Sequence, residues 1–174
     1  MIFKKNLVLV GMMGSGKSTI GKVLSGKLKL SFIDTDSEIE KIENISIKDI
    51  FEIKGEKYFR YLEEKIVLEK LVKGNKIISL GGGAFINLNV RNIVLKKNLS
   101  FWLHWNNETL INRLIKNRRR PLINNLSIGE IKNIIKNRLM FYKQANYKID
   151  CENLTKYEIA EKIIKIYKDE CNKS

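Results

Sequence analysis

Residues 11–19 read GMMGSGKST, a stretch in which glycines lead into a lysine and two hydroxyl side chains. The spacing from Gly11 to Ser18 fits the pattern G-x-x-x-x-G-K-[ST], after the apolar run Leu7–Val10 and before an amphipathic helical stretch. Glycines let successive backbone N–H groups point at phosphate oxygens, and the N-terminus of the following helix adds partial positive charge. The stretch, called the P-loop below, therefore predicts a nucleoside triphosphate site, with ATP as the expected ligand.

The side chains of the P-loop have distinct expected roles. Lys17 reaches the β- and γ-phosphates, Ser18 gives its hydroxyl to Mg²⁺, and Thr19 lies close to the α-phosphate. A glycine-rich turn that binds nothing is the alternative, and the correct context of the motif argues against it. The predicted nucleotide-binding residues of the loop are Gly14, Ser15, Gly16, Lys17, Ser18 and Thr19.

Two carboxylates one residue apart, Asp34 and Asp36, come directly after the apolar run Ser31–Ile33. Ligands of an open α/β sheet collect at the carboxyl ends of its strands, so these aspartates should meet the P-loop in one cleft. There one aspartate can face a metal ion and the other an acceptor hydroxyl. The alternative is that both only cap the helix that follows.

A third apolar run, Lys76–Leu80, ends in three consecutive glycines, Gly81, Gly82 and Gly83. Several adjacent glycines indicate a backbone that a small ligand approaches closely, whereas an ordinary turn explains one or two. Arg60 shares a helix face with Glu63, so it is either half of a surface ion pair or a clamp for a ligand carboxylate.

Elements that could position these residues alternate along the chain. Short apolar runs are separated by stretches with helical periodicity, as at Ile20, Leu24 and Leu28. The alternation predicts a parallel sheet with helices on both faces, a three-layer α/β domain. Two capping boxes mark helix starts, at residues 127–130 and 155–158. The five expected strands are Leu7–Val10, Ser31–Ile33, Lys76–Leu80, Leu99–Trp105 and Tyr147–Cys151.

Composition sets the outer limits of the interpretation. With 174 residues, of which 44% are hydrophobic and 30% charged, the chain is expected to form a single domain over residues 1–174. No apolar run is long enough for a signal peptide or a bilayer span, which predicts a cytoplasmic protein with no membrane partner. A single histidine, and two cysteines outside any C-x-x-C pair, are too few for a zinc cluster or a Cys/His dyad. Both cysteines are therefore expected to be reduced thiols.

The formal net charge of +14 raises the question of a nucleic-acid partner. Most lysines are scattered, which indicates compositional bias, and the one dense cluster is Arg118–Arg120 before Pro121. Because no interleaved aromatic platform accompanies the charge, we expect no nucleic-acid partner, although a nucleic-acid-binding ATPase remains an alternative. His104, Trp102 and Trp105 are interpreted as packing residues rather than ligands.

The chain resembles the shikimate kinases over almost its whole length. The resemblance rests on five motifs in order: GMMGSGKST, DTD at 34–36, FR at 59–60, GGG at 81–83, and RP at 120–121 followed by Arg138 in NRLMFY. Many families share the P-loop alone, whereas the ordered set is specific. The resemblance implies transfer of the ATP γ-phosphoryl group to shikimate, giving shikimate 3-phosphate in aromatic amino acid biosynthesis, with Mg²⁺ as cofactor.

For the acceptor, the resemblance implies that Asp36 meets the ring hydroxyls of shikimate and that Arg60 and Arg138 meet its carboxylate. Phe51 and Phe59 are similar to the apolar wall of the family's pocket. The implied substrate-binding set is Asp36, Arg60, Gly81, Gly82, Gly83 and Arg138.

For the nucleotide, the resemblance implies that Arg113 packs against adenine and that Arg120 closes over the phosphates, although Arg118 or Arg119 could take that place. Asp34 resembles the family's aspartate that holds Mg²⁺ through water, with Ser18 as the direct ligand. The implied catalytic residues are Lys17, Asp36 and Arg120.

The family fold is a P-loop kinase domain with a five-stranded parallel sheet in the order 2-3-1-4-5. The resemblance places a substrate-binding segment at residues 35–63 and a mobile lid at residues 114–126, and a monomer is the default expectation. Two alternatives stay open: a related small-molecule kinase such as a gluconate kinase, and a regulatory domain in which ATP only switches a partner surface.

Overall fold

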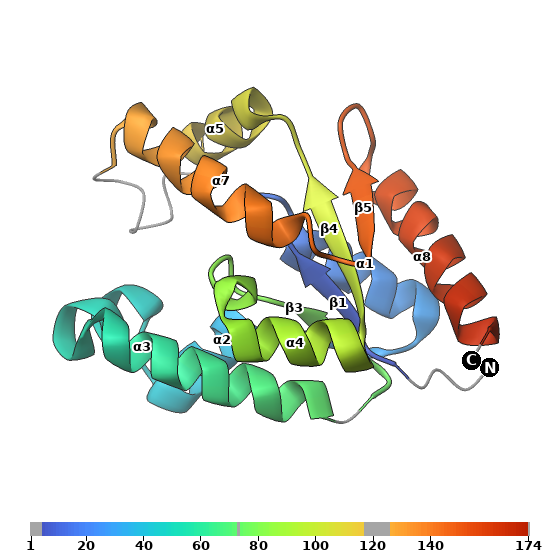
Figure 1. Cartoon of the computed structure of the whole chain (residues 1–174), viewed down its shortest axis with the longest axis horizontal. Coiled ribbons are helices and arrows are strands. Elements are labelled where there is room, and N and C mark those ends of the chain that lie inside the picture. The colour runs from blue at the N-terminus through green and yellow to red at the C-terminus, as the bar shows by residue number, and fades with distance from the viewer. Residues whose placement is uncertain (1–4, 73, 117–125, 174) are drawn as a thin grey trace.

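Five parallel strands form one sheet in the order β2-β3-β1-β4-β5 in the computed structural model, which describes residues 5–72, 74–116 and 126–173 (Figure 1). This confirms the predicted fold class and strand order. The observed strand ends differ from the predicted ones by no more than one residue. The strands are β1 (Leu7–Val10), β2 (Ser31–Asp34), β3 (Lys76–Ser79), β4 (Leu99–His104) and β5 (Tyr147–Asp150).

Burial explains why the central strands read as continuous apolar runs. Strand β1 lies between β3 and β4, and all four of its side chains are buried, because helices cover both faces of the sheet. Strand β2 is an edge strand, and its residues are exposed or only partly buried. The sequence LVLV of β1 therefore belongs at the centre of the sheet, where it carries the P-loop.

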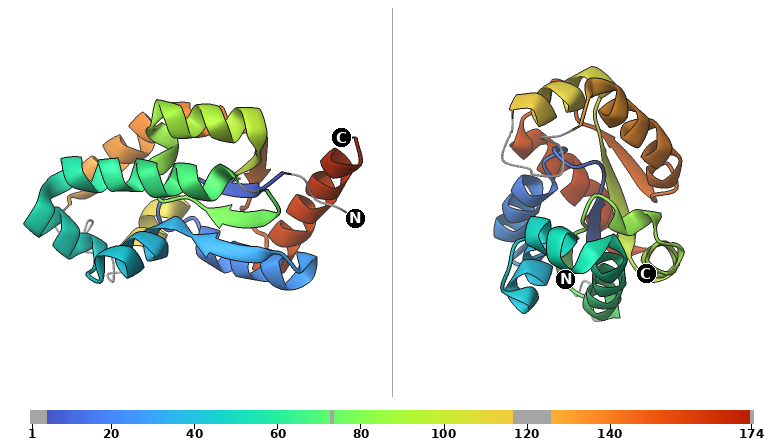
Figure 2. Two further views of the ribbon diagram at one scale, coloured as in Figure 1. Left: turned by 90° about the horizontal axis from the view of Figure 1, so that it is seen from below. Right: turned by 90° about the vertical axis from the view of Figure 1, so that its left-hand side faces the viewer.

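Helices α1 and α8 pack against each other on one face of the sheet, while α3 and α4 pack together on the other (Figures 1 and 2). Helix α7 packs against α5 and the 3₁₀ turn η1. Both predicted capping boxes are present, at Ser127–Glu130 and Thr155–Glu158. The helices are α1 (Lys17–Leu28), α2 (Thr35–Glu43), α3 (Ile47–Val72), α4 (Leu88–Lys97), α5 (Asn107–Lys116), α7 (Ile128–Tyr142) and α8 (Lys156–Asn172), with η1 at Ala84–Ile86.

Helix α3 is bent at Gly55, whose φ of 78° and ψ of 166° lie outside the helical region. A positive φ suits glycine, so the chain turns there at little steric cost. Helices α2 and α3 enclose a small apolar cluster separate from the main core, formed by Ile39, Ile50, Phe59, Leu62 and Ile66. The predicted substrate-binding segment, residues 35–63, thus has packing of its own beside the sheet.

The packing roles predicted for the two tryptophans are confirmed, because Trp102 and Trp105 both belong to the main core. His104 stands edge-on to Trp102, and its Nδ1 lies 2.6 Å from Asp150 Oδ1. Burial raises the pKa of the Cys151 thiol to about 12, so it stays protonated at neutral pH.

The predicted lid falls mainly on residues 117–125, so Arg118, Arg119 and Arg120 lie outside the described residues. None of the helices in the described ranges has the length and apolar character that crossing a membrane requires.

Candidate active site

The carboxyl ends of β1, β2 and β3 open into a cleft with a volume of about 780 Å³. Its walls come from the P-loop, α2, α3, α5, α7 and the glycine triplet, so the convergence predicted from the strand ends is found. Ser15 and Gly81 are buried beside the cleft rather than in its lining. The predicted residues that line it are Gly14, Gly16, Lys17, Ser18, Thr19, Asp34, Asp36, Phe51, Phe59, Arg60, Gly82, Gly83, Arg113 and Arg138.

The P-loop presents positive charge to this cleft. Lys17 is only 8% exposed, and its Nζ donates to the carbonyls of Gly11 at 2.8 Å and Met12 at 3.0 Å. Gly14 and Gly16 have φ values of 80° and 91°, which favour glycine. Helix α1 begins at Lys17 with no acidic residue in its first turn, so its N-terminus is free to attract phosphate.

Ser18 and Asp34 bring two oxygen atoms together at the start of α1. Ser18 Oγ donates to Asp34 Oδ2 at 2.5 Å, while Asp34 Oδ1 accepts the Ser37 N–H at 3.4 Å as the N-cap of α2. The capping alternative therefore holds for Asp34, which faces the P-loop as well. A hydroxyl beside a carboxylate is an oxygen donor set that suits Mg²⁺. Across the residues that the structure describes, His, Cys, Asp and Glu form no group of three that could hold a metal ion, and Mg²⁺ commonly relies on substrate phosphates and water for its other ligands.

The glycine triplet marks the other end of the cleft. Two predicted acceptor-binding side chains press against the α-carbons of Gly81 and Gly83, and a third lies in ordinary contact with that of Gly82. A Cβ atom built on each would meet Asp36 Oδ1 at 2.3 Å from Gly81, Arg138 Nη1 at 3.4 Å from Gly82, and Arg60 Nη1 at 2.5 Å from Gly83. The triplet thus lets Asp36 and Arg60 approach its backbone closely, and the predicted approach of a small ligand stays a prediction.

Hydrogen bonds leave two donors of the triplet unused. The three carbonyls accept from the Ala84 N–H, the Tyr142 hydroxyl and the Ile86 N–H, and the Gly81 N–H donates to Thr35 Oγ1. The amides of Gly82 and Gly83 bond to no group in the part of the chain that the structure describes. Since both residues line the cleft, these two N–H groups are available to an oxygen atom of a ligand.

Arg60 is held by two carboxylates of its own helix. Its Nη1 donates to Glu63 Oε2 at 2.8 Å, and its Nε and Nη2 both donate to Glu56 Oε1 at 3.2 Å. Burial lowers the pKa of Arg60, but the charges of Glu63 and Glu56 outweigh burial and hold that pKa above its usual value. The guanidinium is therefore a fixed positive charge at the acceptor end.

Glu63 is a site residue that sequence reasoning missed. It is 4% exposed, and burial raises its pKa; the charge of Arg60 opposes this rise, while that of Asp36 adds to it. The spacing from Arg60 showed a shared helix face, but only the fold places Glu63 between Arg60 and Asp36. Two carboxylates and the guanidinium of Arg60 thus form one charged network.

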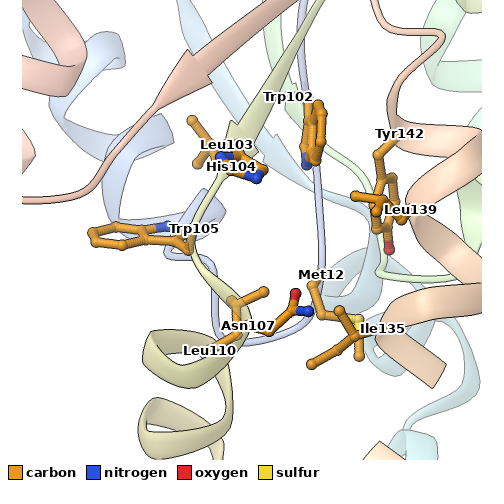
Figure 3. Close-up of a pocket in the computed structure, with 10 residues that line it drawn as sticks. All are labelled: Met12, Trp102, Leu103, His104, Trp105, Asn107, Leu110, Ile135, Leu139 and Tyr142. Atoms are coloured by element: carbon orange, nitrogen blue, oxygen red, sulfur yellow. The ribbon is translucent and has the colours of Figure 1, made fainter. Parts of the chain in front are cut away.

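Tyr142 is a second missed residue, on α7 one turn after Arg138. Its hydroxyl donates to the Gly82 carbonyl at 2.5 Å, and burial raises its pKa to about 12, so it remains a donor at neutral pH. Figure 3 shows its ring beside Leu139, across a small cavity of about 20 Å³ from Met12 and Trp102. Tyr142 therefore ties α7 to the triplet.

Aromatic rings border both ends of the cleft. At the acceptor end, the centroids of Phe51 and Phe59 lie 4.6 Å apart, and Arg60 Cζ lies 5.1 Å from the Phe59 ring. At the opposite end, Arg113 Cζ lies 3.8 Å from the centroid of Trp105. The contact of Arg113 with adenine stays a prediction.

Comparison with known proteins places this geometry in a family. The family model described as shikimate kinase matches residues 13–168. The chain belongs to the shikimate kinase family. It is therefore a kinase, and the resemblance read from the five motifs is confirmed.

Relatives of this family match over nearly the whole chain. The shikimate kinase of Sulfurihydrogenibium sp. (strain YO3AOP1) is 42% identical over 160 residues, covering 92% of this chain and 96% of that protein. The shikimate kinase of Bacillus subtilis (strain 168) is 39% identical over 172 residues, covering 95% and 90%. The structure of the Acinetobacter baumannii shikimate kinase in complex with shikimate matches with a TM-score of 0.88 and 28% identity, covering 95% of this chain and 94% of that one.

For the alternative of a gluconate kinase, the comparison supports a shared fold and no shared activity. A gluconokinase from Sinorhizobium meliloti matches with a TM-score of 0.63 at 15% identity. That likeness reflects the P-loop kinase fold that the two chains share.

Proposed function

We propose that the chain transfers the γ-phosphoryl group of ATP to a ring hydroxyl of shikimate, giving shikimate 3-phosphate and ADP. One observation carries the proposal: Asp36, Arg60 and Arg138 converge on the glycine triplet in the cleft that the P-loop also lines. This convergence supports an acceptor site for a small anionic alcohol next to a phosphate site. The product belongs to the biosynthesis of aromatic amino acids.

The acceptor end matches the groups that shikimate carries. Its carboxylate suits the guanidinium groups of Arg60 and Arg138, together with the two unused amides of the triplet. Its hydroxyls suit the carboxylate of Asp36, which accepts hydrogen bonds. The paired rings of Phe51 and Phe59 offer an apolar surface to the flat part of the carbon ring.

Transfer requires positioning and charge neutralisation more than covalent chemistry by the protein. Asp36 orients the acceptor hydroxyl and takes its proton as the hydroxyl oxygen bonds to the γ-phosphorus and the bond to the β,γ-bridging oxygen breaks. Lys17 exchanges the carbonyls of Gly11 and Met12 for phosphate oxygens, where its charge opposes the negative charge of the transition state. The arginines of the acceptor end remain on the carboxylate of the acceptor.

A magnesium ion completes the proposed site. Ser18 would bind it directly and Asp34 through water, and the ion, when bound, would neutralise phosphate charge. Closure of Arg120 over the phosphates stays a prediction, as do the lid, the monomeric state and the cytoplasmic location.

Release of ADP in the presence of Mg-ATP tests the proposal. Shikimate, quinate, gluconate and single-stranded nucleic acid are compared with no acceptor. We expect release that depends on shikimate, and about 10³-fold slower turnover in Asp36→Asn with ATP binding retained. Asp169→Asn, an exposed aspartate of α8, is the matched control and should turn over normally.

Three outcomes would contradict the proposal or part of it. Release that depends on quinate or gluconate instead of shikimate would keep the phosphate site but overturn the acceptor. Release stimulated only by nucleic acid would show that the basic surface defines the function. Near-normal turnover in Asp36→Asn would remove Asp36 from the catalytic role.

A further inference from the structure

Trp105 lies at the carboxyl end of β4, directly beside the P-loop. Its indole Nε1–H donates to the carbonyl of Ser15 at 2.9 Å in a buried hydrogen bond. A P-loop turns amides toward phosphate, so its carbonyls need partners elsewhere. Trp105 supplies one of these partners, and Figure 3 shows its ring on the other side of the β4 end from Trp102. The ring is therefore fixed to the loop that holds the phosphates.

Arg113, on α5, lies over the indole ring of Trp105. Its Cζ is 3.8 Å from the ring centroid, well within the range of a cation–π contact. Arg113 also lines the cleft, together with Gly14 and Thr19 of the nucleotide end. Whereas Arg60 is held by two carboxylates, Arg113 has no carboxylate partner among the residues described. The indole is thus the neighbour that holds the guanidinium in place.

Sheet order fixes which part of a nucleotide reaches Arg113. The acceptor groups follow β2 and β3, the P-loop follows β1, and Trp105 follows β4 on the opposite side of β1. A nucleotide whose γ-phosphate faces Asp36 therefore extends its base toward the β4 side. A guanidinium is flat, and one covered on one face by an aromatic ring offers its other face to a second ring.

We propose that Trp105 is a positioning residue of the nucleotide site. It holds Arg113 as a platform for the nucleobase and ties that platform to the P-loop through the Ser15 carbonyl. The proposal rests on the proposed function, since it takes ATP as the phosphoryl donor. It adds a binding role to a residue whose type and burial indicate packing alone.

Binding of two ligands shows whether Trp105 supports the nucleobase or only the phosphates. ADP carries both parts, whereas inorganic pyrophosphate carries only the phosphates. In calorimetric titrations without acceptor, we expect Trp105→Leu to weaken ADP binding about tenfold and pyrophosphate binding less than about threefold. Trp105→Phe keeps a ring and removes the N–H donor, so its loss for ADP should be intermediate. In steady state, the KM for ATP should rise while the KM for shikimate stays constant.

Two further variants complete the design. Tyr157→Leu removes the ring of another cation–π pair, that of Lys156 and Tyr157 at the start of α8, and should leave ADP affinity unchanged. Arg113→Ala should cost ADP affinity in the wild-type chain and markedly less in the Trp105→Leu chain, because the platform is already lost there. Thermal unfolding monitored by circular dichroism checks the fold of each variant. If Trp105→Leu does not fold, Trp105→Phe replaces it in both comparisons: ADP against pyrophosphate, and Arg113→Ala with and without the change at residue 105.

Equal losses for ADP and pyrophosphate would overturn the proposal, since Trp105 would then support only the P-loop. Unchanged ADP affinity in Trp105→Leu would overturn it as well, because the base would not rest on the platform. Neither result depends on the acceptor. A failure of shikimate-dependent ADP release, with these titrations as expected, would overturn the proposed function alone.

Discussion

The two ends of the cleft are built in different ways. The nucleotide end is made largely from the backbone of consecutive residues, with Lys17 resting on the carbonyls of its own loop. The acceptor end is made from side chains far apart in the sequence, and Asp36, Arg60 and Arg138 converge at the glycine triplet. A local element thus forms the proposed phosphate site, whereas tertiary packing assembles the proposed acceptor site.

This difference has consequences for how each end tolerates change. Three features adjoin the acceptor end: the small apolar cluster of α2 and α3, the bend of α3 at Gly55, and the hydrogen bond from Tyr142 to Gly82. Displacement of any one of these elements should alter acceptor binding first. The P-loop is anchored to β1 in the main core, so nucleotide binding should change little.

Among variants that separate the two ends, Lys17→Ala should have the largest effect, because it removes the buried positive charge of the P-loop. We expect turnover to fall by about 10²–10³ while shikimate still binds. Steady-state assay of ADP release measures the loss. Lys22→Ala, at an exposed position of the same helix, is the matched control and should behave like the wild type. Loss of shikimate binding in Lys17→Ala would contradict the claim that the two ends bind their ligands separately.

Gly83→Ala should selectively damage the acceptor end. The new Cβ would lie 2.5 Å from Arg60 Nη1, and the guanidinium is the flexible end of a side chain, so it moves instead of unfolding the chain. We expect the KM for shikimate to rise about tenfold, with the KM for ATP unchanged. Gly26→Ala, which meets no atom within 4 Å, should leave both constants as they are. A rise in the KM for ATP alone would contradict the assignment of Gly83 and Arg60 to the acceptor end.

Tyr142→Phe should have a smaller effect on the same end. Without the hydroxyl, the Gly82 carbonyl loses its donor, which should lower the free energy of unfolding by about 1–3 kcal/mol. We expect the KM for shikimate to rise about threefold. Urea unfolding and steady-state kinetics measure both effects, with exposed Tyr61→Phe as the control. Unchanged stability and kinetics would show that Tyr142 does not hold the triplet.

Glu63→Gln should have the smallest effect, which is a change in how the free energy of unfolding depends on pH. Its folded pKa lies above the unfolded value of 4.5, so between the two values the folded chain binds a proton that the unfolded chain does not. Stability contributed at this site therefore falls as pH rises through that window. Urea unfolding of the wild type and Glu63→Gln should show their difference shrinking as pH rises above 4.5.

Glu158 provides a comparison of opposite sign. The Thr155 amide and hydroxyl donate to its carboxylate and lower its pKa, so its contribution is present above pH 4.5 and lost as pH falls. The difference between the wild type and Glu158→Gln should therefore grow as pH rises. Parallel curves for Glu63→Gln and the wild type would remove Glu63 from the charged network.

The contrast between the two ends also explains what the sequence alone could predict. The strands, their order and the P-loop follow from local patterns together with the resemblance, and the structure agrees with them. Glu63 and Tyr142 could not be assigned from the sequence. The role of Glu63 depends on its burial, and that of Tyr142 depends on a contact with Gly82, 60 residues away along the chain. For Asp34 the sequence left two roles as alternatives, and the structure shows both: its carboxylate caps α2 and also accepts a hydrogen bond from Ser18.

The most direct test titrates shikimate and ADP separately into Arg60→Ala and Lys17→Ala by calorimetry. We predict that Arg60→Ala loses at least about tenfold in shikimate affinity and keeps ADP affinity within about twofold, and that Lys17→Ala does the reverse. Equal loss of both ligands in either variant would contradict the account, since the cleft would then be one cooperative site rather than two separately built ends.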